Sequence, residues 1–345
     1  MSRQKRALAL IAVAIGAAML TPAVAQNGIE AFYRGKTIRL LIGANVGGGY
    51  DAYARLIGRH IGKYIPGRPN IVPSNMSGAG GNTLLNYVYA AAPRDGTVLA
   101  AASPGALLDP LIGDKTNLKH DPLQLSYIGS ATGEVFTCMV RTDAAKSFED
   151  VFSKEVIIGS SGGTTHDMPR ALMNVLGVKF KLISGYRGTA DVMLAVDRGE
   201  VQGICGQGYA NILWQRPDWF GLGSPVRVLA QESIAGNSEL NKQGVPRTLD
   251  FAKTAEQRQI LEIVYAQGLF TRPFVMAPDV LQERVEAIRA AFMEALADPE
   301  LLADAQKQSL TVIPMSGVDL DQMIRKIYAT PPDVIEKVRK AILDQ

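Results

Sequence analysis

Short apolar runs alternate with helical patterns along most of this chain, and the turns between them are rich in glycine. Residues 37–43 read as a buried strand, and residues 52–64 after them have the periodicity of an amphipathic helix. Residues 70–73, 82–91 and 97–102 continue the order as strand, helix and strand. Such units place parallel strands side by side with helices over the sheet. The sequence therefore predicts an α/β protein.

The same pattern continues far enough for a second domain. Five later apolar runs read as strands: 135–140, 155–159, 179–183, 201–205 and 226–230. Amphipathic helices at the carboxyl end, beginning with 278–297, are expected to cover the first domain. About 320 residues exceed what one core usually holds. We expect residues 26–126 to begin lobe 1, residues 127–267 to form lobe 2, and residues 268–345 to return to lobe 1.

The first residues have the organisation of an export signal. A basic segment at 2–6 precedes the apolar run 7–20, and Ala23-Val24-Ala25 supplies a cleavage pattern. The alternative is a retained membrane anchor, but the run is shorter than the roughly 20 residues that a spanning helix needs. Residues 1–25 are therefore predicted to be a signal peptide that is cleaved after Ala25.

Charge argues against a nucleic-acid partner. The 36 basic residues exceed the 33 acidic ones by three, and Arg3, Lys5 and Arg6 of the predicted signal account for that excess. The mature chain is therefore near neutral, and it has no basic stripe with interleaved aromatic residues.

The two cysteines leave their state open. Cys138 and Cys205 lie in apolar runs, where they could pair if neighbouring strands bring them together. Two buried free thiols are the favoured alternative, because a domain of this size needs no disulfide.

Glycine-rich turns at 47–51, 78–82 and 160–165 each follow an apolar run and precede a helical pattern. Backbone N–H groups and a helix N-terminus would converge there on an anion. Tight βα loops need glycine in any case. Three such turns with hydroxyl and amide side chains nevertheless favour one shared ligand beyond the carboxyl ends of the strands.

Two enzymatic interpretations of these turns are weak. The G-x-G-x-x-A pattern at 47–52 lacks the acidic residue that a dinucleotide site places about 20 residues later. The G-x-S-x-G pattern around Ser161 resembles a nucleophile elbow, but the last histidine, His166, follows only five residues later. An exported serine hydrolase that uses Ser161 remains the alternative function.

The histidines and acids show no metal-binding spacing, so we predict neither a metal nor a cofactor. His60 is expected on the surface of its helix. His166 opens a helix beside the third glycine turn, where a first-turn role and a ligand contact are equally favoured.

Taken together, several motifs resemble the Bug-type solute-binding proteins of tripartite tricarboxylate transporters. The resemblance covers nearly the whole mature chain in order. Its motifs are the strand and G-G-G-x-D helix at 37–56, the turns at 78–82 and 159–165, A-P-R-D-G-T at 92–97, G-Y-R-G at 185–188 with Ala190-Asp191, and A-D-P-E at 297–300.

This resemblance implies a periplasmic, two-lobed Venus flytrap fold, with two mainly parallel, doubly wound sheets joined by two hinge strands near Ser126 and Gly268. Such a protein is a monomer and not an enzyme. It captures a small carboxylate between its lobes and delivers it to permease subunits in the membrane. The residues carried over to ligand binding are Gly48, Gly49, Tyr50 and Asp51 in the first loop, Ser77, Gly78, Ala79 and Gly80 beside it, and Ser161, Gly162, Gly163, Thr164 and Thr165 from the other lobe.

Departures from the family pattern suggest the ligand class. Tyr50 stands where the family usually has threonine, and its ring suits a flat or aromatic acid as well as a di- or tricarboxylate. Gln207 follows a strand after which many members have aspartate, which makes an amino-acid ligand less expected. Arg187 is the nearest candidate cation, with a structural pairing to Asp191 or Asp197 as the favoured alternative.

Overall fold

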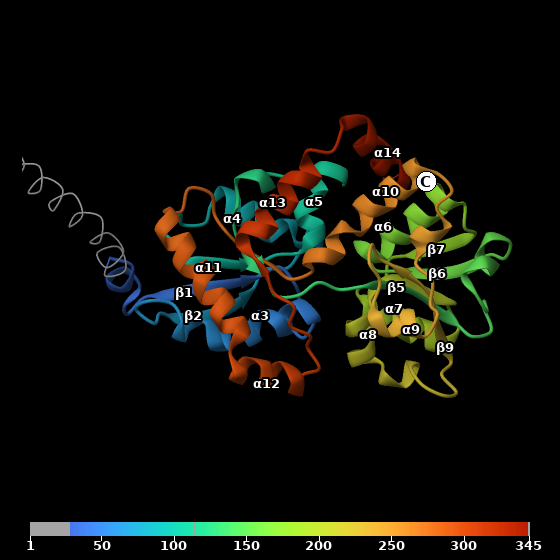
Figure 1. The fold of residues 1–345 in the computed structure, drawn as a ribbon, viewed down its shortest axis with the longest axis horizontal. Coiled ribbons are helices and arrows are strands. Elements are labelled where there is room, and N and C mark those ends of the chain that lie inside the picture. The colour runs from blue at the N-terminus through green and yellow to red at the C-terminus, as the bar shows by residue number, and fades with distance from the viewer. Residues whose placement is uncertain (1–27, 114, 344–345) are drawn as a thin grey trace, which may run out of the picture.

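The computed structural model describes residues 28–113 and 115–343, so the predicted signal peptide lies outside the described residues. Figure 1 shows two lobes side by side, each built around a β-sheet with helices on its faces. The helices of the described ranges are all too short or too polar to cross a bilayer.

The first lobe contains a sheet in the order β11-β4-β10-β3-β1-β2. β1 pairs in parallel with β2 and β3, whereas β10 pairs antiparallel with β3 and β4. All four residues of β3 are buried, as expected for a central strand. The strands are β1 (Thr37–Ile42), β2 (Asn70–Asn75), β3 (Val98–Ala101), β4 (Ser126–Ser130), β10 (Pro273–Met276) and β11 (Met315–Ser316).

Helices cover this sheet, and three of them follow its strands directly. α3 follows β1, α4 follows β2 after a short turn, and α5 follows β3. α11 buries Val285, Ile288 and Phe292 on the face that the sequence pattern indicates. The helices are α3 (Gly49–His60), α4 (Asn82–Ala90), α5 (Pro104–Ile112), α11 (Gln282–Ala297), α12 (Pro299–Lys307) and α13 (Gly317–Tyr328).

The second lobe contains a sheet in the order β7-β6-β8-β5-β9. β6 pairs in parallel with β7 and β8, and β5 pairs antiparallel with β8 and β9. Its strands are β5 (Phe136–Arg141), β6 (Val156–Ser160), β7 (Phe180–Ser184), β8 (Gly203–Gly208) and β9 (Val226–Glu232). Its helices are α6 (Thr164–Ala171), α7 (Thr189–Arg198), α8 (Tyr209–Gln215), α9 (Ser238–Lys242) and α10 (Ala255–Tyr265).

Both sheets are mixed: each has a group of three parallel strands, and the strand that arrives from the other lobe, β10 or β5, pairs antiparallel with both of its neighbours. β5 is the first strand after the chain leaves β4, and β10 is the first after it returns. The two connecting segments pair with each other: Glu134 N–H donates to Gly268 O at 2.8 Å, and Thr271 N–H donates to Thr132 O at 3.0 Å. Residues 131–135 and 268–272 therefore form a two-stranded hinge.

The hinge begins later than the sequence pattern suggests. Lobe 2 is expected to start at residue 127, but residues 126–130 form β4 within the first sheet. The partners of β4 are β10 and β11, which lie far along the chain. Local periodicity carries no information about such distant pairing.

The last helix, α14 (Pro332–Leu343), also differs from expectation. It does not cover lobe 1 but packs on α6 and α10 of lobe 2 and touches α5 of lobe 1. In Figure 1 it crosses above the space between the lobes. Asn174 Nδ2 donates to Ala341 O at 2.9 Å on one side, and Arg339 donates to Gly113 O at 3.0 Å on the other. An amphipathic face shows that a helix is buried, not which lobe buries it.

Cys138 and Cys205 form a disulfide between the adjacent antiparallel strands β5 and β8. The prediction of two free thiols, which rested on a domain of this size needing no disulfide, is therefore wrong. The pairing of β5 with β8 brings the two side chains together.

Candidate functional site

The three glycine turns meet at one cavity between the lobes. β1, β2, β3 and β6 lead into α3, α4, α5 and α6, so four helix N-termini lie at the carboxyl ends of the strands. The cavity has a volume of about 650 Å³. Of the predicted residues, it is lined by Tyr50, Ala79 and Gly80 from lobe 1 and by Gly162, Gly163 and Thr164 from lobe 2. Asn82, Ser103, Asp109, Asp167 and Gln267 also line it.

Asp51 shapes the first turn. Its carboxylate accepts hydrogen bonds from Gly47 N–H at 3.0 Å, Arg55 Nε at 2.9 Å and Asn75 Nδ2 at 2.9 Å. Burial alone would raise the pKa of Asp51, but these hydrogen bonds and the Arg55 charge lower it below its usual value. The carboxylate of Asp51 is therefore ionised at neutral pH, and its hydrogen bond from Gly47 N–H closes the turn.

The second turn has an unusual backbone. Gly78, Ala79, Gly80 and Gly81 have positive φ angles of 131°, 46°, 63° and 105°. Ala79 is the strained member, because a Cβ is disfavoured in this region. Ser77 precedes the run as an exposed residue. The strain lies where the backbone borders the cavity, which is a common place for it in binding sites.

The third turn is held by Thr165. Ser161 N–H donates to Thr165 Oγ1 at 3.0 Å, and that hydroxyl donates to Gly162 O at 2.9 Å. Gly163 has φ 57° and ψ −137°, a conformation that suits glycine. Thr164 begins α6, and the first N–H groups of a helix have no intrahelical acceptor. The open donors of this turn therefore lie at Gly163 and Thr164, while Thr165 serves as its internal support.

This two-lobed arrangement matches solved structures. The periplasmic binding protein BugD has a TM-score of 0.67 and 19% identity, over 90% of this chain and 98% of that one. The chain has the fold of a periplasmic solute-binding protein. MatC from Rhodopseudomonas palustris, with bound malate, has a TM-score of 0.64 and 17% identity, over 89% of this chain and 99% of that one. A second R. palustris protein, with adipate, has a TM-score of 0.65 and 19% identity, over 89% of this chain and 97% of that one. No protein-family model and no curated protein matches the sequence, so the likeness is one of structure.

Ten of the sixteen predicted residues lie outside the cavity lining. Seven of them belong to the glycine turns or their immediate flanks: Gly48, Gly49, Asp51, Ser77, Gly78, Ser161 and Thr165. The other three are His166, Arg187 and Gln207. His166 Nδ1 is 3.2 Å from Asp167 Oδ1 and so faces its own helix turn. Arg187 is exposed and lines a separate pocket with Asp191. Gln207 is buried within β8, where its carbonyl accepts a hydrogen bond from Thr137 Oγ1 at 3.1 Å.

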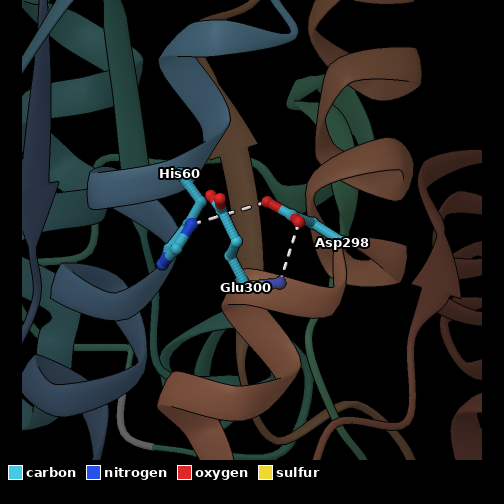
Figure 2. Close-up of side chains that lie close together, drawn as sticks. All are labelled: His60, Asp298 and Glu300. Atoms are coloured by element: carbon cyan, nitrogen blue, oxygen red, sulfur yellow. Dashed lines mark hydrogen bonds and ion pairs between the residues drawn. The ribbon is translucent and has the colours of Figure 1, made fainter.

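His60 is buried, at 8% exposure, and not on the surface as expected. Figure 2 shows it beside Asp298 and Glu300, whose possible ligand atoms lie within 4.8 Å of one another. Lys63 Nζ occupies this cluster, 2.5 Å from Asp298 Oδ2 and 2.7 Å from Glu300 Oε2. An ammonium group already provides the cation, so the cluster ties α3 to the start of α12.

Sequence reasoning missed two charged residues at the hinge. Arg272 lies at its second segment, and its guanidinium stacks 4.3 Å from the ring centre of Tyr50. Glu134, from the first segment, lies 3.4 Å from Arg272 Nη2. Each is only 7% exposed. The sequence did carry a signal for Arg272, because it is the one charged residue in the apolar run 269–276, and a charge in such a run is expected to be buried with a partner.

Proposed function

We propose that this protein binds a small carboxylate in the cleft between its lobes and delivers it, in the periplasm, to a permease of the tripartite tricarboxylate type. It acts as a monomer without catalysis. The observation that carries this proposal is that turns from both lobes line one cavity. A ligand held by both would stabilise the closed form, which the permease then recognises.

The chemistry of the lining supports an anionic ligand. Four helix N-termini direct partial positive charge toward the cavity, each worth roughly 0.3–2 kcal/mol to an anion. The described residues that line it include no lysine or arginine. Neutral donors hold an anion without a desolvated ion pair, which permits release.

The ligand class follows from shape and likeness. The structures with malate and adipate hold dicarboxylates in the same fold. Tyr50 adds an aromatic wall to this cavity, so a flat or aromatic acid also fits. We therefore expect a di- or tricarboxylate or an aromatic acid.

Binding can be tested with the mature chain, residues 26–345. Malate, adipate, citrate and benzoate are titrated by thermal shift and calorimetry, with leucine as a comparison. We expect saturable binding of at least one acid, a rise in melting temperature and no product on prolonged incubation. A panel that produces no shift and no heat contradicts the proposal.

A matched pair of variants locates the site. Gly163→Ala forces a side chain onto a conformation that glycine needs and should abolish binding. Gly221→Ala, at φ 98° with open space around it, imposes similar strain on lobe 2 away from the cavity. Equal loss of affinity in both variants would place the site elsewhere. Delivery is tested by uptake of the identified acid in cells that carry wild-type protein or Gly163→Ala.

The alternative function, a serine hydrolase, finds less support in the local contacts. Within the described residues, the hydroxyl of Ser161 has the hydroxyl of Thr165 as its hydrogen-bond partner, at 3.4 Å, and not a histidine. Ser161→Ala decides between the two functions. A hydrolase loses ester turnover in this variant, whereas a binding protein shows only a modest change in affinity.

A further inference from the structure

A buried cation lies directly behind the first glycine turn. Arg272 Nη2 is 3.2 Å from the position that a Cβ would take on Gly49, so the guanidinium packs against the start of α3. Nη1 donates to Thr271 O at 2.9 Å. Nε is buried and has no hydrogen-bond partner among the described residues. The guanidinium thus has an unused donor behind the first glycine turn, although Arg272 itself does not line the cavity.

Two tyrosines of α3 enclose this cation. Tyr50 and Tyr53 are one turn apart, and the guanidinium lies 4.3 Å and 5.0 Å from their ring centres. Tyr50 lines the cleft cavity, whereas Tyr53 lines a second cavity of about 540 Å³ beside the hinge. Arg272 therefore lies in the wall between the two cavities, one aromatic ring away from the cleft. At this short range the buried positive charge attracts an anion in the cleft by Coulomb attraction.

Glu134 neutralises this cation only in part. One oxygen is 3.4 Å from Arg272 Nη2, which is longer than a good charged hydrogen bond. The other oxygen accepts Asn211 N–H at 3.1 Å, at the start of α8. The carboxylate of Glu134 therefore has two positive neighbours, the guanidinium of Arg272 and the N-terminal end of α8. The N-terminal end of α3, which is also positive, lies against the same guanidinium. An additional negative charge is favoured here.

We propose that Arg272 determines the charge that the cleft accepts, by attracting the carboxylate of the ligand in competition with Glu134. The proposal rests on the carboxylate-binding function above. It gives Arg272 the role that the sequence suggested for Arg187. A ligand carboxylate that approaches the start of α3 beside Tyr50 takes up the positive charge that Glu134 leaves uncompensated.

Two charge-removing variants test the proposal through the sign of their effects. Arg272→Gln should weaken binding of the best carboxylate about tenfold or more, because it removes the positive charge behind Tyr50. Glu134→Gln should tighten it several-fold, because the competing charge is gone while an oxygen remains for Asn211 N–H. A purely structural ion pair predicts weaker binding in both variants. Affinity that moves in the same direction in both therefore overturns the proposal.

Salt dependence and a conservative variant separate charge from folding. The affinity of wild type should fall with added salt more steeply than that of Arg272→Gln. Arg272→Lys keeps the charge and should retain most of the affinity. If the glutamine variant does not fold, the lysine variant is compared with wild type in its place. Arg258→Gln removes an exposed arginine on α10 and should bind like wild type. Wild type that binds no carboxylate contradicts the proposed function itself, whereas unchanged binding in Arg272→Gln overturns only this inference.

Discussion

The backbone N–H of Gly47 donates a hydrogen bond to the carboxylate of Asp51, four residues later and 3.0 Å away. The first glycine turn is therefore closed by an acid from the helix that it precedes. Arg55, one turn further along α3, holds the same carboxylate at 2.9 Å. A turn proposed to attract anions is thus closed by an anion of its own, which is paired with Arg55 and lies outside the cavity lining.

Asp51→Asn should destabilise the fold by about 1–2 kcal/mol and weaken ligand binding, because the half-buried Arg55 loses its charged partner. The pKa of Asp51 is lowered in the folded protein. Its contribution is therefore present above the unfolded pKa and is lost as pH falls through the folded pKa. Urea unfolding of both proteins between pH 3 and 7 checks this. Asp143→Asn, at an exposed pair with Arg141, is the control, and an equal binding defect there would contradict the interpretation.

Gly206→Ala should disrupt the third turn. A Cβ on Gly206 would lie 2.0 Å from Thr164 O, so β8 and the start of α6 cannot keep their distance. We expect a loss of about 2 kcal/mol or more together with loss of binding. Gly199→Ala is matched in φ, at 73° against 70°, and has open space around it. Equal destabilisation of the two variants would show that the close approach does not matter.

The stability of the protein should fall as pH rises from about 5 to 8. Burial raises the pKa of Glu232 to about 8, although a hydrogen bond from Gly206 N–H opposes this. The folded chain then holds a proton that the unfolded chain has released above its usual pKa of 4.5. The slope is about 1.4 kcal/mol per pH unit and flattens above the folded pKa.

Urea unfolding at pH 5, 6, 7 and 8 measures this effect. Glu232→Gln should remove this downward slope, since its side chain cannot titrate; burial lowers the pKa of His120, whose smaller opposite contribution remains in the variant. Glu239→Gln, an exposed acid on α9, should retain it. Parallel curves for wild type and Glu232→Gln would contradict the assignment.

Replacing both Cys138 and Cys205 by alanine should lower stability by about 2–4 kcal/mol, because the bond closes a loop with a sequence separation of 67. A thiol assay in denaturant, without reductant, should find no free thiol in wild type purified from an oxidising compartment. Two reactive thiols in that assay would show that the bond does not form.

Local elements of this fold were predictable because each has its own periodicity. The face of α11 that buries Ile288 and Phe292 is visible in the sequence, and so are the runs that form β1 and β6. The sequence did not indicate which elements pack or pair with one another. β4 joins the first sheet through β10, and α14 packs on lobe 2, because these contacts link residues far apart in the sequence.

The candidate site divides in the same way. Glycine marks the turns, and the structure brings all three to one cavity. The roles of side chains depended on neighbours that no motif indicates. Thr165 supports its own turn, Arg187 lies on a different surface, and Arg272 reaches the first turn only because the hinge passes behind it.

The position of α14 constrains how the lobes can move. α13 packs against β4 in lobe 1, α14 lies on lobe 2, and residues 329–331 connect them. With the paired segments of the hinge, this connection makes the two lobes a closed mechanical linkage. Two rigid bodies joined at two separate places swing about the line through those places and resist twisting around any other axis. We therefore expect the last helix to restrict the relative motion of the lobes to rotation about that line.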